Sequence, residues 1–360
     1  MWRWPSSPCP PVATGAPEAA DLDRPVLDLA TVVYRDELPL IRLQARSIAR
    51  MLDPRGIGAI LVMANDREEE ACLAALQDIL PDYGPFADRV ELLRPADLFA
   101  LRPSRLGPRG PLQRVKAAFT ANRSRYPFGV KGGWRGNRGW AVQQALKLAV
   151  ARRGEAANLC ILDAKNHFIR PVGVEAMVAE DGRPRARLEL PNAKHRRWNK
   201  AAFRLLGTPP PGRDDRAPPT LTPFVVSRAD LLATLEALEA RVGPAEAFFA
   251  RKRSEESEFA LIHAAIARRP GGVEAAFAPG LRAAATLRRK KDDATVDRLL
   301  TRVEQGEADM LSIHRTLLGR LKPEHLARLD AIWTAAGLDA SELLRADAAR
   351  RAAASGSQPV

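Results

Sequence analysis

The chain has 360 residues, of which 46% are hydrophobic, so it can bury the core of one large domain or two ordinary ones. Its 56 Lys and Arg residues outnumber 43 Asp and Glu residues, and the formal charge of +13 favours anionic partners without naming one. Three widely spaced cysteines without a CxxC pair indicate neither a disulfide framework nor a zinc knuckle, which fits a reducing cytoplasm.

The two ends of the chain differ in composition from the part between them. Residues 1–24 are rich in Pro and predict a flexible N-terminal segment that is neither a signal peptide nor an anchor. Residues 339–360 predict the end of a helix and then a flexible tail beyond about residue 345. We expect a single domain over residues 25–338. Because no segment approaches the roughly 20 apolar residues that span a bilayer, we expect a cytoplasmic protein whose membrane contact, if any, is peripheral.

Strands and helices alternate in the first hundred residues. Val26–Val33 has the pattern of a buried strand, and Leu38–Leu52 that of an amphipathic helix. A second strand over Ile57–Met63 precedes a helix over Arg67–Ile79, and Arg89–Leu93 is a third, short strand. This alternation predicts an α/β fold of Rossmann-like type, with a mostly parallel central sheet flanked by helices.

The next predicted helix, Gly139–Arg153, has two distinct faces. Its buried stripe comprises Val142, Ala145, Leu146 and Ala149. Gln143 and Lys147 share another face, and the following strand over Leu159–Leu162 ends in Asp163. A polar helix face therefore precedes a carboxylate at the end of a strand.

The remainder of the chain predicts mainly helices. Val174–Leu190 could form a hairpin around Asp181-Gly182, and the proline-rich Thr208–Pro223 must be a loop. A short strand follows over Phe224–Val226. Three further helices are expected over Arg228–Arg241, Pro244–Arg268 and His325–Ala336. The C-terminal part is thus predicted to be helical.

Asp163 is the first candidate functional residue. The carboxyl edge of a sheet is where α/β proteins bind their ligands. A carboxylate there can hold a divalent cation, which in turn neutralises a diphosphate. The alternative is that Asp163 only caps a turn through its own backbone.

Several segments form an ordered series that includes this strand. They are Asp28–Asp36, Gly139-Trp140 with Gln143-Gln144, Leu146–Leu148, Leu162–Asn166, Thr222–Val225, Ser257–Phe259 and Ser312–Arg315. Over about residues 26 to 338 the series resembles an uncharacterised bacterial family similar to GT-A glycosyltransferases. The resemblance implies a GT-A-like domain that transfers a sugar from a nucleotide-sugar donor to a glycan or surface-polymer acceptor, as in polysaccharide biosynthesis.

The resemblance also implies a donor pocket over the carboxyl ends of the first strands. The residues beside the base and ribose would be Thr31, Tyr34, Arg35, Asp36, Asn65 and Asp66. For Asp36 and Asp66 the alternative is that each caps the helix it precedes. Amides, an ammonium and an aromatic ring that suit sugar hydroxyls and phosphate oxygens come from Trp140, Gln143, Gln144 and Lys147. The alternative is that these residues form a solvated face of the helix, with Trp140 packed as a lid.

The metal position departs from the family pattern. GT-A enzymes commonly have Asp-x-Asp here, whereas this chain has Asp163-Ala164-Lys165-Asn166. Lys165 could itself neutralise the donor diphosphate. Alternatively, Asn166 and His314 could complete a site for Mn²⁺ or Mg²⁺ with Asp163. Dependence on a divalent cation therefore stays open.

Glu258 is the second candidate catalytic residue, beside Asp163. By resemblance it would accept the proton of the acceptor hydroxyl as general base. The alternative is an exposed helix on which Glu258 and its acidic neighbours pair with Arg251–Arg253.

Two basic clusters favour a different class of function. Lys194–Lys200 interleaves cations with Trp198, and Arg288–Lys291 is a run of four cations. Either could bind a diphosphate, an anionic glycan or lipid headgroups, and the first also suits single-stranded nucleic acid. The alternative function is thus a non-catalytic protein of this fold that binds nucleic acid or another polyanion, although no recognised nucleic-acid module supports it.

Overall fold

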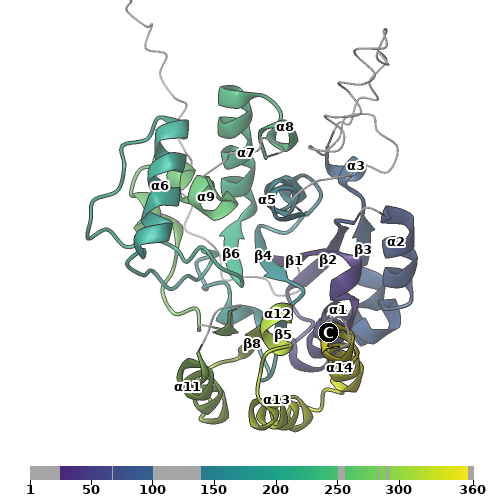
Figure 1. Cartoon of the computed structure of the whole chain (residues 1–360). Helices are drawn as coiled ribbons and strands as arrows, with labels where there is room; N and C mark the ends of the chain where they lie inside the picture. Colours follow the sequence, from purple (N-terminus) through teal and green to yellow (C-terminus); the bar gives the residue numbers. More distant parts are fainter. Residues whose placement is uncertain are drawn as a thin grey trace, which may run out of the picture.

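The computed structural model describes residues 25–66, 68–99, 139–249, 256–282, 284–288 and 292–355, without the side chains of residues 139–141, 247 and 350–355. The N-terminal segment that was predicted to be flexible lies outside this part. The described residues form a central sheet covered by helices on both faces, with a smaller sheet beside it (Figure 1).

The central sheet has the strand order β3-β2-β1-β4-β6. Its strands are β1 (Leu27–Val33), β2 (Ile57–Ala64), β3 (Val90–Leu93), β4 (Asn158–Asp163) and β6 (Phe224–Ser227). The first four run parallel, and only β6 is antiparallel to its neighbour β4. Because a parallel sheet is covered on both faces, β1 and β4 are almost continuously apolar and buried. The predicted mostly parallel central sheet is confirmed.

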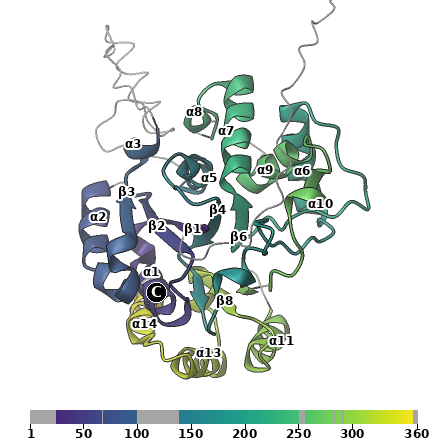
Figure 2. The ribbon, with the colours of Figure 1, turned by 180° about the vertical axis from the view of Figure 1, so that it is seen from behind.

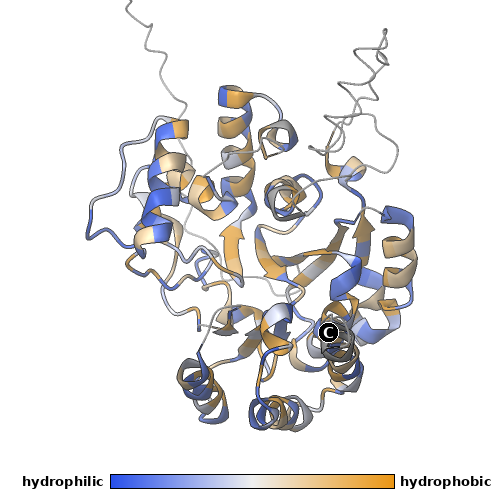
Figure 3. Cartoon of the chain, viewed as in Figure 1, coloured by the Kyte–Doolittle hydropathy of each residue, from blue (hydrophilic) through white to orange (hydrophobic). Residues whose placement is uncertain are grey.

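Two hydrophobic cores lie on opposite faces of this sheet. Successive β1 side chains alternate between them, with Leu29 and Val33 in the first core and Ala30 and Val32 in the second. Figure 3 shows the hydrophobic colouring concentrated along the central strands. The first core contains side chains from α1 (Leu38–Met51), α2 (Glu69–Gln77), η2 (Leu80–Arg89), η4 (Val174–Ala176), α11 (Asp293–Glu304), α12 (Arg315–Leu318), α13 (Pro323–Ala335) and α14 (Ser341–Ser355).

The second core lies under the helices that follow the middle of the chain. It contains side chains from α3 (Pro95–Leu98), α5 (Gly139–Ala149), η3 (Val150–Arg152), α6 (Ala193–Leu206), α7 (Arg228–Val242), α8 (Ala245–Phe249), α9 (Glu258–Ile266) and α10 (Gly272–Ala276). Figure 2 shows α10 beside α9 and α6, which agrees with the contacts between α9 and each of the other two. The predicted α5 stripe of Val142, Ala145, Leu146 and Ala149 is buried, as expected.

A second sheet was missed by the sequence analysis. It has the order β5-β8-β7, formed by β5 (Asn166–Phe168), β8 (Met310–Ile313) and β7 (Ala285–Leu287). Each strand has only three or four residues, which is too short for an alternating pattern to stand out. Because β4 ends at Asp163 and β5 begins at Asn166, the second sheet fixes the position of the chain that follows Asp163.

Three sequence predictions are wrong in detail. The hairpin around Asp181-Gly182 is reduced to one isolated bridge, between Val178 and Pro184, although Gly182 does adopt a turn conformation with φ 78°. The single helix expected over Pro244–Arg268 is two helices, α8 and α9, in the described residues. The tail expected to be flexible beyond about residue 345 continues as α14 to Ser355, with Leu343 at its start buried.

None of the helices in the described part of the chain combines the length and the apolar run that crossing a bilayer requires.

Candidate functional site

Asp163 lies at a topological switch point of the central sheet. After β1 the chain passes through α1 to β2 on one side, whereas β4 lies on the other side of β1 and is preceded by α5 on the opposite face. The register pairs Val32 of β1 with Asp163 of β4, so the carboxyl ends of both strands meet there. Open α/β sheets bind ligands in the crevice outside such a point.

Four side chains donate to the Asp163 carboxylate. Its Oδ1 accepts hydrogen bonds from Lys147 Nζ at 2.6 Å and from Gln143 Nε2 at 3.0 Å. Its Oδ2 accepts from Thr222 Oγ1 at 2.9 Å and from the Lys165 ammonium. Gln143 and Lys147 reach the same oxygen because they are four residues apart on one face of α5. The turn-capping alternative for Asp163 is therefore wrong, because its carboxylate binds side chains from three other places in the chain.

The two ammonium groups keep Asp163 ionised. Burial acts to raise the pKa of Asp163, but the positive charges of Lys147 and Lys165 outweigh it and hold that pKa far below its usual range. Burial would lower the pKa of Lys147, yet Asp163 and Glu258 raise it. The carboxylate retains 17% of its side-chain surface exposed, and Lys165 retains 22%. The site thus presents a charged group and one partly accessible cation.

Glu258 is part of the same buried cluster. It is the first residue of α9, only 5% exposed, and its Oε1 lies 3.6 Å from Lys147 Nζ. Its backbone N–H donates to Gln144 Oε1 at 3.2 Å, so α5 fixes the start of α9. Burial raises the pKa of Glu258, and the charge of Lys147 offsets only part of that rise. The alternative of an exposed surface carboxylate is wrong for Glu258.

Glu37 belongs to the site although the sequence analysis did not select it. It is half-buried at the start of α1, where the chain leaves β1. Burial and the nearby negative charge of Asp163 raise the pKa of Glu37 to about 7, while Lys165, Arg315 and Lys147 act in the opposite direction. A carboxyl group with this pKa exchanges its proton near neutral pH. Its place directly after Asp36, in the turn that follows β1, was the signal that could have identified it.

The turn after β1 brings an aromatic ring and an arginine together. Arg315, from the start of α12, lies over the Tyr34 ring with 5.5 Å between its Cζ and the ring centroid. Its Nη1 also pairs with Asp36 Oδ2 at 2.7 Å. Asp66 accepts both the backbone N–H and the Nε of Arg35, each at 2.9 Å, and so ties the turns after β1 and β2 together.

Three of the predicted donor-binding residues support the site from within the core. The Thr31 hydroxyl is 2% exposed and donates to Gln44 Oε1 at 2.9 Å. Asn166 is fully buried and accepts the Asp163 backbone N–H at 2.7 Å. Gln144, also fully buried, bonds to the start of α9 as described above. Asn65 is buried just after β2, and the Trp140 side chain lies outside the described residues.

The donor set around Asp163 does not fit a divalent cation. A carboxylate has about four lone-pair sites, and four donors already occupy them, two of which are cations. His314 accepts the Thr316 N–H at 3.2 Å through Nδ1 as it caps α12. Among the described residues no group of three His, Cys, Asp or Glu side chains is arranged to hold a metal ion.

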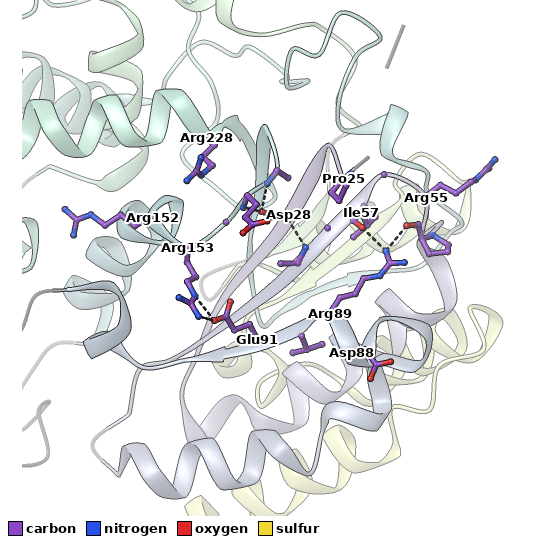
Figure 4. A pocket seen from close by; sticks show the side chains of 18 residues that line it. Pro25, Asp28, Arg55, Ile57, Asp88, Arg89, Glu91, Arg152, Arg153 and Arg228 are labelled. Atoms are coloured by element: carbon purple, nitrogen blue, oxygen red, sulfur yellow. Dashed lines mark hydrogen bonds and ion pairs between the residues drawn. The ribbon is translucent and has the colours of Figure 1, made fainter. Parts of the chain in front are cut away.

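A large cavity lies at the opposite, amino-terminal edge of the sheet. It has a volume of about 1270 Å³ and is rich in arginines (Figure 4). Its arginines are bound to the protein itself: Arg89 donates to the carbonyls of Pro54 and Ile57, and Arg153 pairs with Glu91. We therefore do not regard this cavity as the candidate site.

Comparisons with known proteins give one family match and several likenesses of fold. A sequence model described as a family of unknown function (DUF6492) matches residues 117–293, which include Asp163, Lys147 and Glu258. No curated protein matches the chain. These results agree with the expected resemblance to an uncharacterised family.

Two solved glycosyltransferase structures are similar to the chain. One is galactosyltransferase LgtC in complex with donor and acceptor sugar analogues, at 8% identity and a TM-score of 0.40, covering 86% of this chain and 95% of that one. The other is mouse xyloside xylosyltransferase 1, at 11% identity and a TM-score of 0.34, covering 80% and 98%. At such low identities and scores neither likeness carries an inference about function.

Proposed function

We propose that the protein is a glycosyltransferase that moves a sugar from a nucleotide-sugar donor to a saccharide acceptor. The observation that carries this proposal is the ionised Asp163 at the switch point between β1 and β4, held by Lys147 and Lys165. Around it lie the groups that such a donor requires. Tyr34 and Arg315 offer an aromatic ring and a guanidinium to the base and phosphates, and Lys165 offers a partly accessible ammonium to the diphosphate.

In the proposed reaction, the bond between the anomeric carbon and the diphosphate oxygen breaks, and the diphosphate leaves with the electron pair. The acceptor hydroxyl oxygen forms the new bond to that carbon and loses its proton. Lys165 and Arg315 stabilise the charge that develops on the leaving diphosphate. Asp163, ionised and paired with both lysines, positions the Lys165 ammonium for the diphosphate.

We assign proton acceptance to Glu37 rather than to Glu258. Glu37 is half-buried and has a pKa of about 7, so it is both accessible and able to take up a proton near neutral pH. Glu258 is 5% exposed and directed toward Lys147, which suits it to positioning that ammonium.

The test is a thermal-shift screen with uridine, guanosine and cytidine diphosphates. One of them, at 100 times its Kd, should stabilise the folded protein by about 2.7 kcal/mol. The shift should fall most in Lys165→Gln, which removes the more exposed cation, and should also weaken in Asp163→Asn, which no longer holds Lys165 in place. Asp88→Asn, an exposed acid at the far edge of the sheet, should keep the full shift. The selected nucleotide sugar should then be hydrolysed or transferred by the wild-type protein.

If none of the diphosphates shifts the wild-type melting temperature, or if Asp163→Asn folds and keeps the full shift, the proposal is wrong. Circular dichroism of each variant distinguishes loss of binding from loss of folding.

A further inference from the structure

A second cavity, beside the candidate site, is lined by a cluster of arginines. It has a volume of about 330 Å³ and lies between the loop before β6, β7 and α11. Arginines from four segments line it, namely Arg187, Arg282, Arg288, Arg298 and Arg302. Among the described residues of its lining, Glu189 is the only one that carries a carboxylate. The described lining therefore carries a net positive charge.

Two of these five arginines form no ion pair with an acid among the described residues. Arg187 pairs with Glu189 at 3.0 Å, Arg282 with Asp309 at 3.0 Å and Arg302 with Glu307 at 2.8 Å. In the described part of the chain, Arg288 and Arg298 have no acidic partner within ion-pair distance, and both are exposed. Two guanidiniums are thus available to an anionic ligand.

The cavity is connected to the candidate site through Thr222. This residue lines the cavity, and its hydroxyl donates to Asp163 Oδ2 at 2.9 Å. Leu221 and Pro223, on either side of Thr222, add apolar surface to the lining. A ligand in the cavity would therefore extend toward the carboxylate where the sugar is transferred.

An adjoining cavity of about 250 Å³ extends the arginine-lined space toward α6. The two cavities share Glu189, Pro219, Leu221 and Arg288, and the adjoining cavity is also lined by His195. Burial and the positive charges of Arg288 and Lys194 lower the pKa of His195 to about 4, so the ring is neutral at pH 7 and offers hydrogen bonds rather than charge. Together the cavities have room for more than one sugar unit.

We infer that the two joined cavities bind an acceptor saccharide that carries phosphate or carboxylate groups, held by Arg288 and Arg298. This inference rests on the proposed function and names the chemical class of its acceptor. Guanidinium groups bind both kinds of anion through paired hydrogen bonds, and apolar surface with hydrogen-bonding groups suits the sugar rings.

The lining argues for a saccharide over single-stranded nucleic acid. Proteins that bind single strands stack bases on aromatic side chains. Among the described residues that line the two cavities, His195 is the only aromatic ring. Trp198 is stacked against His195 and lies under the Lys194 ammonium, outside both linings.

The experiment measures binding of anionic and neutral saccharides by calorimetry at low salt. Trigalacturonate is compared with neutral maltotriose, and mannose 6-phosphate with mannose, so that carboxylate and phosphate are tested separately. The anionic member of at least one pair should bind more tightly, and its affinity should fall at least tenfold in Arg288→Gln/Arg298→Gln. The matched control, Arg268→Gln/Arg320→Gln, removes the same charge from exposed positions outside both cavities and should bind within twofold of the wild type.

Equal binding of anionic and neutral saccharides, or equal losses in the two double variants, would overturn the inference. Single-stranded oligothymidylate that binds more tightly than either anionic saccharide, and only when Arg288 and Arg298 are present, would overturn it in favour of a nucleic-acid site. The diphosphate screen is run on the same protein. A diphosphate shift without anionic saccharide binding rejects only the acceptor class, whereas saccharide binding through these arginines without a diphosphate shift rejects the transferase.

Discussion

The buried ammonium of Lys147 balances the charge of two carboxylates, Asp163 at 2.6 Å and Glu258 at 3.6 Å. We predict that Lys147→Met lowers the free energy of unfolding by about 3–5 kcal/mol at pH 8, because it leaves the buried Glu258 without its cation and Asp163 with Lys165 alone. The deficit should shrink as the pH falls toward 4, since protonation removes the unpaired charge of Glu258. Urea denaturation at both pH values measures this. Lys200→Met, at an exposed position, is the control, and a deficit that does not depend on pH would contradict the explanation.

Glu37 should set the pH dependence of the reaction. Its pKa of about 7 predicts that activity rises with pH through 7, as the group loses its proton and becomes able to accept another. Glu37→Gln should remove that rise and reduce kcat/KM about 100-fold. The pKa of Glu37 is raised from 4.5 to about 7 in the folded protein, so its protonated form stabilises the fold. This stabilisation is fully present below pH 4.5 and is lost as the pH rises through 7. Urea denaturation of Glu37→Gln should therefore show a smaller loss of stability between pH 5 and pH 8. If the pH–rate profile of Glu37→Gln is the same as that of the wild type, another group accepts the proton.

Lys165 occupies the position where the second acid of Asp-x-Asp would lie. Because Lys165 already neutralises Asp163, a chelator should leave the nucleoside diphosphate shift of the wild-type protein unchanged. Lys165→Asp should gain Mn²⁺ binding, measurable by calorimetry, and its diphosphate shift should then require the metal. Loss of the wild-type shift on chelation would contradict this.

At the scale of elements, the Asp28 side chain links neighbouring segments at the amino edge of the sheet. Asp28 accepts the backbone N–H groups of Ala59, Glu155 and Ala156 at 2.8–3.0 Å. It thereby joins β2 and the segment leading into β4 to β1. A Cβ on Gly58 would lie 2.3 Å from its carboxylate, which accounts for a glycine beside it.

Asp28→Asn should lower the free energy of unfolding by about 2–3 kcal/mol, because the amide NH₂ would face a backbone donor. Urea denaturation measures the loss. Asp88→Asn, in the same cavity and exposed, should change stability little. Binding of the selected diphosphate should survive in both variants, since the site is at the other edge.

The long apolar strands and amphipathic helices were predictable because their patterns are local. β1, β2, β4, α1 and α7 appear within one or two residues of their predicted bounds. The short strands β5, β7 and β8 were not, since their partners lie far away in the sequence. At the site, the position of Asp163 at the end of a strand and the shared helix face of Gln143 and Lys147 could be predicted from the sequence. Burial of Thr31 and Asn166, and the approach of Glu37 and Thr222, depend on tertiary packing that no local pattern encodes.

For the whole molecule, the C-terminal boundary predicted at residue 338 can be tested by truncation. α14 packs on α1, Leu343 is 1% exposed, and Glu342 pairs with Arg42 at 2.6 Å. A chain ending after Leu338 should therefore be less stable by about 2–4 kcal/mol, mainly through exposed apolar surface. A chain ending after Ser355 is the control and should match the full protein in urea denaturation. Equal stability of the two truncated chains would support the predicted boundary.

The double attachment of Asp163 has a consequence for turnover. In the proposed function, a bound diphosphate would compete with Asp163 for the ammonium of Lys165, which is 22% exposed. Lys147 is only 5% exposed and would remain paired with Asp163 as its counter-ion. The two lysines would therefore leave Asp163 paired with a cation both with and without the diphosphate.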